Sequence, residues 1–275
     1  MEERTKVGPS NGSLVVMGGG YLREPEILKR FIALAGGPSA PIVIIPTASK
    51  ADYYGPYAPY IDDFMAAGAL QLKVLHTRSR ETANSEEFVE AIRQAQGIWF
   101  SGGRHWRLAD VYLNTKTVDE LFALLDRGGV IGGTSAGATI QGSYLVRADT
   151  KNNYIMMGDH EEGFGFLRNV AIDQHHLRRN RHFDLIELIE AHPELLGIGI
   201  DEETAIIVRG DEFEVIGRSY VAIYDNKRLL ESKGRFYFLA AGDRYDLNKR
   251  EVITPPAEDP RGFERLVEQE WALYE

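Results

Sequence analysis

Cysteine is absent from the sequence. Its absence excludes disulfide bonds, thiolate metal sites and a cysteine nucleophile, and it leaves the redox compartment undetermined. Long hydrophobic runs are absent as well: no stretch of about 18 apolar residues occurs, and the polar start MEERTKVGPSNG lacks the apolar core of a signal peptide. We therefore expect a soluble protein, either cytoplasmic or exported with its signal peptide already removed.

Positive charge is in short supply, because 31 Lys and Arg residues face 41 Asp and Glu residues, for a net charge of -10. Nucleic acids and anionic membranes are bound by clustered Lys and Arg, so we expect neither as a partner. The 275 residues, 44% of them hydrophobic, are typical of a globular protein. No repeat, low-complexity segment or linker divides the chain, so we expect a single domain over residues 1–275, with a flexible segment over 1–12.

The first half of the chain alternates apolar runs with amphipathic segments. Strands are expected at 13–18, 40–49, 72–76, 97–103 and 129–133, and helices at 24–34, 60–68, 85–95 and 118–129. Apolar strands without polar alternation, separated by helices, predict a doubly wound α/β protein with a mostly parallel sheet. Strand-like runs at 197–210, 212–225 and 234–242 predict antiparallel additions to the same sheet, and a helix over 261–275 closes the chain.

A serine lies between two glycines in the stretch IGGTSAGATIQG, residues 131–142. Ser135 follows an expected strand and precedes helix-forming residues, which is the position of the nucleophile in a strand-to-helix elbow. The flanking glycines allow close backbone approach, and the helix N-terminus supplies N–H groups for a developing oxyanion. The alternative is a tight turn in which the serine caps a helix.

A serine nucleophile needs a base, and the chain has seven histidines. In VAIDQHHLRRNRH, residues 170–182, a short apolar strand ends in Asp173, Gln174, His175 and His176. Ligands bind at the carboxyl ends of strands in α/β sheets, so His175 or His176 is the best candidate for the base. An ordinary structural histidine is the alternative.

A carboxylate that orients the base is harder to choose. Strand alternation in GIGIDEETAIIV places Glu202 on a mostly apolar side, together with Ile200 and Thr204. A carboxylate in that position requires a partner, and a histidine N–H would serve. The alternative is that Glu202 points into solvent at a strand end or turn.

Three motifs together carry a family resemblance. GGTSAGA around Ser135, IDQHHLRRNR around His175 and GIGIDEETAI around Glu202 resemble cyanophycinases, serine peptidases related to peptidase E (aspartyl dipeptidase). VVMGGG, IVIIPTAS and GIWFSGG are similar as well, so the resemblance runs from about residue 13 to residue 225. It implies a flavodoxin-like fold similar to class I glutamine amidotransferases, a peptide substrate, a homodimer, and neither a metal nor an organic cofactor.

The resemblance also implies roles for individual residues. Ser135 would be the nucleophile, His175 the general base and then acid, and Glu202 the residue that orients the imidazole. The backbone N–H groups of Gly103 and Ala136 would form the oxyanion hole. The implied substrate-binding residues are His105, Asp173, Gln174, Arg179 and Arg181.

Two positions depart from the family pattern, in which the substrate is cyanophycin, a poly-aspartate with arginine on each side chain, cleaved to β-aspartyl-arginine. Asp184 stands where an arginine is expected, and His105 where a glutamine is expected. Asp184 either faces a cation of the substrate or pairs with Arg181 at helical spacing. Both departures concern substrate recognition and leave the implied triad unchanged.

Two functions of other classes stay open. A non-catalytic binding protein on the same fold would keep the elbow without a working triad. A metal-dependent hydrolase would use His160 and Glu161 together with Asp173, His175 and His176, because imidazole and carboxylate suit zinc.

Overall fold

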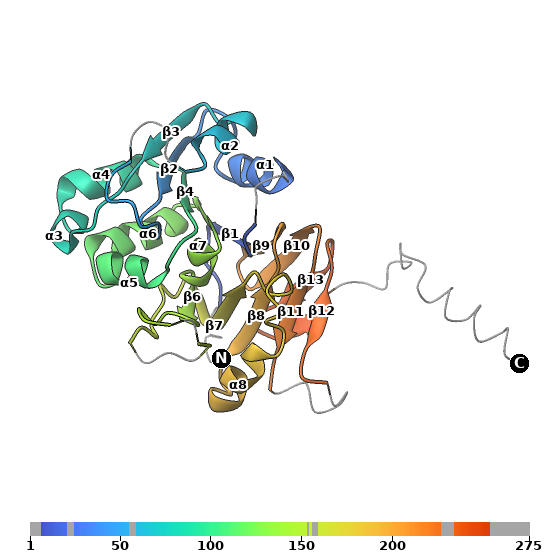
Figure 1. Ribbon diagram of the computed structural model, residues 1–275. Coiled ribbons are helices and arrows are strands. Elements are labelled where there is room, and N and C mark those ends of the chain that lie inside the picture. Colours follow the sequence, from blue (N-terminus) through green and yellow to red (C-terminus); the bar gives the residue numbers. More distant parts are fainter. Residues whose placement is uncertain are drawn as a thin grey trace, which may run out of the picture.

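The strands form two sheets in the part of the chain that the computed structural model describes, which is residues 7–20, 25–54, 59–152, 154–155, 159–226 and 234–253 (Figure 1). The larger sheet has the strand order β14-β13-β10-β9-β1-β5-β4-β2-β3, and the smaller sheet the order β12-β11-β8-β7-β6. No helix among these residues is long and apolar enough to cross a membrane.

The larger sheet contains β1 (Ser13–Met17), β2 (Pro41–Ile45), β3 (Gln71–Val74), β4 (Gly97–Phe100), β5 (Val130–Thr134), β9 (Thr204–Arg209), β10 (Glu212–Gly217), β13 (Arg244–Asp246) and β14 (Glu251–Val252). The smaller sheet contains β6 (Gly142–Tyr144), β7 (Leu167–Gln174), β8 (Leu196–Ile200), β11 (Val221–Tyr224) and β12 (Tyr237–Leu239). The helices are α1 (Pro25–Leu34), α2 (Ile61–Ala66), α3 (Arg80–Ala83), α4 (Glu86–Gln94), α5 (Trp106–Tyr112), α6 (Lys116–Asp126), α7 (Ala136–Thr139) and α8 (Asp184–Ala191).

The parallel core is confirmed. Strands β1 to β5 pair only in parallel with one another, in the order β1-β5-β4-β2-β3, and the antiparallel strands come from the C-terminal part of the chain. Helices cover both faces of this core because its strands are apolar on both sides. On one face Phe31 of α1 and Phe64 of α2 pack edge-on against Trp99 of β4, with ring centroids 5.2 Å and 5.5 Å apart.

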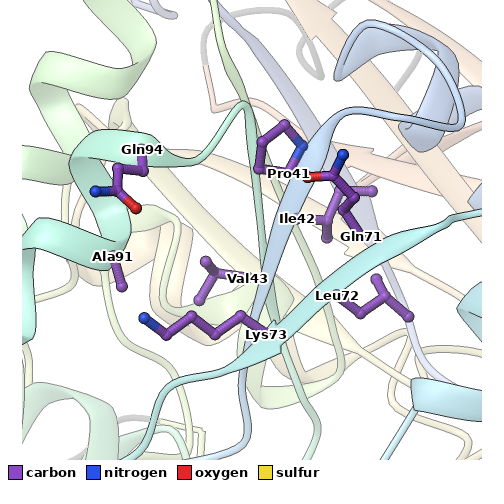
Figure 2. Close-up of a pocket in the computed structure, with 8 residues that line it drawn as sticks. All are labelled: Pro41, Ile42, Val43, Gln71, Leu72, Lys73, Ala91 and Gln94. Atoms are coloured by element: carbon purple, nitrogen blue, oxygen red, sulfur yellow. The ribbon is translucent and has the colours of Figure 1, made fainter.

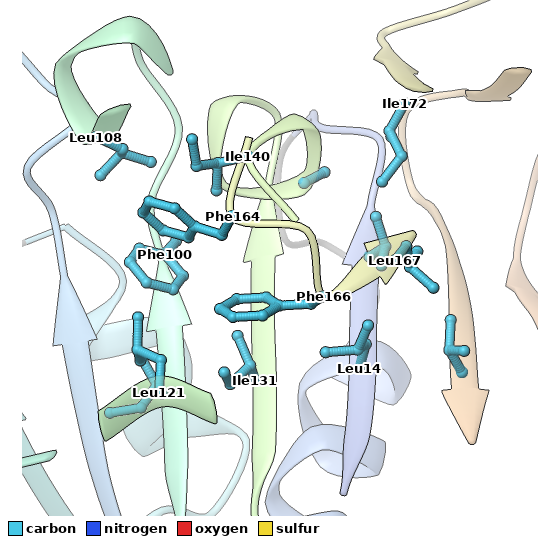
Figure 3. Close-up of a cluster of buried hydrophobic side chains, with 14 of the residues drawn as sticks. Leu14, Phe100, Leu108, Leu121, Ile131, Ile140, Phe164, Phe166, Leu167 and Ile172 are labelled. Atoms are coloured by element: carbon cyan, nitrogen blue, oxygen red, sulfur yellow. The ribbon is translucent and has the colours of Figure 1, made fainter. Parts of the chain in front are cut away.

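The smaller sheet shares a core with the larger one. One cluster of buried side chains contains Leu14 of β1, Leu121 of α6 and Ile172 of β7, so the two sheets and the helices α4 to α6 bury their apolar faces together. Phe164 and Phe166 lie in this cluster between the elements, as Figure 3 shows. The helix α8 covers the outer face of the smaller sheet. The single domain expected over residues 1–275 stays a prediction.

The expectation that all C-terminal strands join one sheet is wrong in part. β9, β10, β13 and β14 extend the larger sheet, whereas β8, β11 and β12 belong to the smaller one. The single run expected at 197–210 is two strands, because the turn at 201–203 takes the chain from one sheet to the other. All of β8 is buried, since it packs between the shared core and α8.

Two expectations concern the termini. The helix expected over 261–275 lies outside the described residues. In the expected flexible segment, residues 1–6 also lie outside them, but residues 7–12 are held in place: the Val7 N–H donates to Asp211 Oδ1 at 2.6 Å, and Gly8 is buried. The flexible segment therefore does not extend over residues 7–12.

Candidate active site

Ser135 stands in a sharp turn between β5 and α7, with φ 55° and ψ -110°. A Cβ at Gly133 would lie 2.9 Å from the Gly137 Cα, and a Cβ at Gly137 would lie 2.7 Å from the Phe100 Cβ, so only glycine fits at either position. The Ser135 side chain makes no capping hydrogen bond to α7, which rules out the helix-cap alternative. The turn exposes the hydroxyl in the manner of a nucleophile elbow.

His175 follows the last residue of β7 and contacts the serine. Its Nε2 lies 2.9 Å from Ser135 Oγ, and its Nδ1 lies 2.7 Å from Glu202 Oε1. An ionised carboxylate can only accept a hydrogen bond, so Nδ1 carries the proton and Nε2 presents its lone pair to the serine hydroxyl. Of the two candidate histidines, the structure therefore brings His175 to Ser135.

His176 points elsewhere, because its Nε2 lies 2.8 Å from the Tyr224 hydroxyl and its Nδ1 lies 3.3 Å from Asp173 Oδ2. Both contacts are buried, and neither involves Ser135. His176 is an ordinary structural histidine beneath the site.

Glu202 is the expected partner, but it does not lie on a strand. It occupies the turn between β8 and β9, and its side chain is 27% exposed. The alternation argument was wrong for this residue because the strand pattern is interrupted at 201–203. The alternative of a turn position was correct, whereas the solvent-facing side chain that went with it was not.

The glycine run after β1 makes room for the histidine and the glutamate. A Cβ at Gly19 would lie 2.7 Å from His175 Nδ1, and a Cβ at Gly20 would lie 3.0 Å from the Glu202 Cβ. The His175 N–H donates to the Gly18 carbonyl at 2.8 Å. The sequence shows this run as VVMGGG, but only the fold reveals that it touches residues far away in the chain.

Burial lowers the pKa of His175 from its ordinary value. The hydrogen bond that His175 donates to Glu202 acts in the opposite direction, and the charges of Arg179 and Arg181 lower the pKa further. The imidazole is therefore neutral at neutral pH. A neutral imidazole with Nδ1–H held by a carboxylate is able to take a proton at Nε2.

One of the two expected oxyanion-hole residues directly follows the serine, and the loop that carries the other passes close to it. Ala136 is the first residue of α7, so its N–H has no intrahelical acceptor. The N–H of Gly103 donates to no backbone carbonyl within the described residues. The loop that carries Gly103 passes close to the nucleophile, because the Ser135 Cβ lies 3.4 Å from where a Cβ on Gly102 would be.

Asp173 is buried beneath the site rather than open to a ligand. Its carboxylate, with no exposed area, contacts Arg147 Nε at 2.9 Å, His176 Nδ1 at 3.3 Å and Arg181 Nη1 at 3.4 Å. Burial acts most strongly and in the direction of a higher pKa, but the hydrogen bond with His176 and the charges of Arg147 and Arg181 together hold the pKa of Asp173 below its ordinary value. The expectation of direct substrate contact does not fit this position, because the carboxylate is fully buried.

Arg147 is a residue that sequence reasoning missed. It follows β6, adopts a positive φ of 57°, and pairs with both Asp173 and Asp184. The ion pair that Asp184 forms within the protein is with Arg147, not with Arg181 as one alternative expected. A lone arginine in the sequence YLVRADT carries no pattern that could have revealed it.

The other expected substrate residues differ in exposure. Arg179 is exposed, whereas Arg181 is buried and donates to the Gln174 carbonyl at 2.8 Å and to Gln174 Oε1 at 3.3 Å. His105 is 3% exposed, its Nε2–H donates to the Val146 carbonyl at 2.7 Å, and its Nδ1 has no partner within the described residues. Burial lowers the pKa of His105 to about 4. Arg179 is thus open to a ligand, while Arg181, Gln174 and His105 support the site from beneath.

Two other features of the structure bear on possible ligand or metal binding. A hollow of about 230 Å³ at the amino-terminal ends of β2 and β3 is lined by Lys73 and uncharged side chains (Figure 2), at the opposite end of the strands from Ser135. The described residues contain no group of three or more His, Cys, Asp or Glu that could hold a metal. His160, expected in the metal alternative, contacts Asp110 at 2.9 Å and Asp159 at 3.2 Å.

Residues 14–216 match the model of Peptidase family S51. The chain belongs to this family. It is 33% identical to the cyanophycinase of Geminocystis herdmanii over 85% of this chain and 93% of that protein. It is also 33% identical to the cyanophycinase of Nostoc sp. over 92% of this chain and 91% of that protein. The resemblance stated from the three motifs is confirmed, and the chain is a cyanophycinase-like serine peptidase.

Solved structures agree with this placement. A crystal structure of a peptidase from an acI-B1 Actinobacterium superposes with a TM-score of 0.66 and 27% identity, covering 87% of this chain and 98% of that one. A putative peptidase E from Listeria monocytogenes EGD-e gives a TM-score of 0.53 at 19% identity, covering 76% and 99%, and shows the fold alone.

Proposed function

We propose that the chain hydrolyses peptide or isopeptide bonds of aspartyl peptides, with cyanophycin as the leading candidate substrate, and that Ser135, His175 and Glu202 form its catalytic triad. The observation that carries the proposal is the continuous line of contacts from Ser135 Oγ through the His175 ring to Glu202, with distances of 2.9 Å and 2.7 Å. A serine, an imidazole and an orienting carboxylate in this geometry suit acyl transfer.

The steps follow from the positions of the atoms. His175 Nε2 takes the proton of Ser135 as Oγ attacks the carbonyl carbon, and the backbone N–H groups of Gly103 and Ala136 bind the resulting oxyanion. His175 then gives its proton to the leaving amine, which leaves an acyl-enzyme on Ser135. Water attacks this ester with His175 again as base, and Ser135 regains its proton as the acid product forms. Glu202 keeps Nδ1 protonated throughout.

Substrate choice rests on charge and on the relatives. The proteins at 33% identity are named cyanophycinases. Arg179 is exposed near His175 and is available to a substrate carboxylate. Asp184 is bound to Arg147, so the replacement of the expected arginine does not leave a free negative charge in its place. These observations favour an acidic peptide.

The first test is hydrolysis of insoluble cyanophycin and of a panel of α- and β-aspartyl dipeptides, with Ser135→Ala as the control. We expect release of β-aspartyl-arginine by the wild type, and a loss in kcat/KM of at least about 10³-fold in the variant. Turnover of other dipeptides alone would retain the triad and change the substrate. No turnover, together with no labelling of Ser135 by a serine-directed probe, would favour a non-catalytic binding protein.

We further expect a homodimer, which light scattering of the purified protein would test. A mass of 30.8 kDa, that of one chain, would contradict this expectation.

A further inference from the structure

We propose that Tyr60 is a substrate-contacting residue, whose hydroxyl donates a hydrogen bond to the acyl part of the substrate where that part lies over Gly102, beside Ser135. The acyl part is the part that becomes bound to the serine. The proposal rests on the proposed function for the triad and for the aspartyl substrate. It adds a contact on the side of Ser135 that lies opposite to His175.

The strand order places His175 and Tyr60 on opposite sides of the nucleophile. Ser135 follows β5, which lies between β1 and β4 in the larger sheet, and β2 lies beyond β4. His175 contacts the glycine run after β1, whereas Gly102 follows β4 and Tyr60 stands at the end of the loop between β2 and α2. These strands are parallel, so the residues that follow them meet at one edge of the sheet. The order along that edge is His175, Ser135, Gly102 and Tyr60.

This order assigns the two halves of the substrate to the two sides of the serine. His175 Nε2 lies 2.9 Å from Ser135 Oγ and gives its proton to the leaving amine, so the amine lies on the β1 side. The acyl part is joined to the scissile carbonyl carbon away from the amine. It therefore extends toward β4 and passes over Gly102.

Gly102 leaves space that the fold does not require. Its φ is not in the left-handed region, and the nearest atom of the described residues to a Cβ built there is the Ser135 Cβ at 3.4 Å, an ordinary contact distance. Gly103 differs, because its φ is 145° and a Cβ would overlap the Ala48 carbonyl. Alanine would therefore fit at position 102 but not at 103. The glycine at 102 keeps a space open next to the nucleophile.

The Tyr60 hydroxyl forms the far wall of this space. Its oxygen lies 3.6 Å from the same Cβ position at Gly102. Tyr60 adopts a left-handed φ of 73°, which is uncommon for a residue other than glycine. Its ring packs against the buried cluster that contains Phe64 and Trp99, which fixes the direction of the side chain. Strained backbone of this kind is found often at functional sites.

The hydroxyl is a hydrogen-bond donor at neutral pH. Burial raises the pKa of Tyr60, a hydrogen bond with the Gly102 backbone acts in the opposite direction, and the charge of Asp63 raises the pKa further. A protonated phenol can accept a hydrogen bond at its oxygen and still donate its hydrogen. Tyr60 can therefore contact the Gly102 backbone and a substrate oxygen at the same time.

An aspartyl acyl group carries the oxygen that this donor needs. Besides the scissile carbonyl it contains a second carboxyl-derived group, which is a free carboxylate in a dipeptide and an amide in cyanophycin. The oxygens of both groups accept hydrogen bonds. An alanyl or β-alanyl acyl group has no such oxygen, so the contact with Tyr60 selects for aspartyl substrates.

The first test compares Tyr60→Phe with wild type on the best aspartyl dipeptide and on its analogue without the second carboxyl group. The analogue is a β-alanyl dipeptide for a β-aspartyl substrate, and an alanyl dipeptide for an α-aspartyl one. We expect kcat/KM to fall about 10-fold on the aspartyl substrate and less than about 2-fold on the analogue. Equal effects on both substrates, or none on either, would overturn the contact.

Tyr54→Phe is the matched control for this comparison. Tyr54 lies in the same loop after β2, and its hydroxyl donates to the Pro46 carbonyl at 3.1 Å. We expect this variant to cleave both substrates at the wild-type rate. A loss in Tyr54→Phe as large as that in Tyr60→Phe would refute a specific role of the Tyr60 hydroxyl.

A labelling experiment separates the proposal from the proposed function. Diisopropyl fluorophosphate bonds to the serine oxygen with loss of fluoride and needs no peptide substrate. We expect Gly102→Ala to keep the melting temperature of wild type but to be labelled at Ser135 at least about 10-fold more slowly, because the methyl group fills the space beside the serine. Tyr60→Phe should be labelled at the wild-type rate, since the probe contains no aspartyl group.

Slow labelling of a stable Gly102→Ala protein would support the acyl site over Gly102 even if the wild type cleaved no aspartyl substrate. Labelling of Gly102→Ala at the wild-type rate would refute this site even if cyanophycin were cleaved. A large fall in the melting temperature of Gly102→Ala would also refute it, because the glycine would then serve the fold.

Discussion

Ser135 and His175 meet across the active site, but the structure holds them by different means. The serine elbow depends on space: a Cβ at Gly137 would come within 2.7 Å of the Phe100 Cβ, so backbone segments touch where no side chain fits. The strand that ends just before His175 carries buried charges, where Asp173 meets Arg147 and Arg181. The stability of the protein should therefore respond to added side-chain volume on the serine side of the site, and to a change of charge on the histidine side.

The largest effect is expected from Gly137→Ala. The added methyl group would overlap β4 in the tightest part of the elbow, and we expect a loss of more than about 5 kcal/mol in the free energy of unfolding, with loss of activity. Gly128→Ala is the control, because Gly128 has a positive φ of 89° but open space around it, so backbone strain alone should cost about 1–2 kcal/mol. If urea unfolding showed similar losses of stability in the two variants, the added volume at Gly137 would not be the cause of the destabilisation.

Asp173→Asn comes next. Removal of the carboxylate charge takes away the buried anion that Arg147 and Arg181 share, so two buried guanidinium groups lose part of their charge compensation, and we expect a loss of about 3–5 kcal/mol in the free energy of unfolding. Glu214→Gln, which breaks the half-exposed pair with Arg30, should cost less than about 1 kcal/mol. If the denaturation midpoints of the two variants fell equally, the buried charges on the histidine side would contribute no more to stability than an exposed ion pair does.

The smallest expected effect is a dependence of stability on pH, and it comes from His105. His105 begins the turn into α5, and its Nε2–H donates to Val146, which follows β6. The unfolded chain binds a proton at His105 near pH 6.5, whereas burial lowers the pKa in the folded protein to about 4. Stability should therefore fall as the pH decreases from 6.5 to 4, by at most about 3 kcal/mol from this residue, and level off below.

The measurement is the melting temperature as a function of pH for wild type and His105→Gln. The glutamine amide can still donate to Val146 but cannot take up a proton, so the variant should lose less stability in acid. If the two melting-temperature curves ran parallel between pH 6.5 and 4, protonation of His105 would not contribute to the loss of stability in acid.

The sequence predicted the parallel core well, because the inner strands β1, β2, β4 and β5 are continuous apolar runs and the longer helices are amphipathic. It did not separate the two sheets, since burial on both faces looks alike in β1 and β8. The short helices α3, α5 and α8 were not identified, because four to eight residues of helix depend on tertiary packing for their stability.

The residues of the candidate site were predicted in part, and the sequence arguments for them differ in strength. Ser135 follows from local pattern, because an elbow is a local structure. Glu202 was chosen from the alternation of a strand, but it lies in a turn, where strand alternation does not apply. Its contact with His175 depends on the space that the glycines after β1 leave. Arg147 could not be found, because nothing in its own neighbourhood indicates that it reaches Asp173.

The turn at 201–203 carries the chain from the smaller sheet into the larger one, and Glu202 lies in it. A chain still being synthesised that stops before this turn holds the serine and the imidazole but lacks the carboxylate that orients them. The proposed triad is therefore complete only after the chain has passed from the smaller sheet into the larger one.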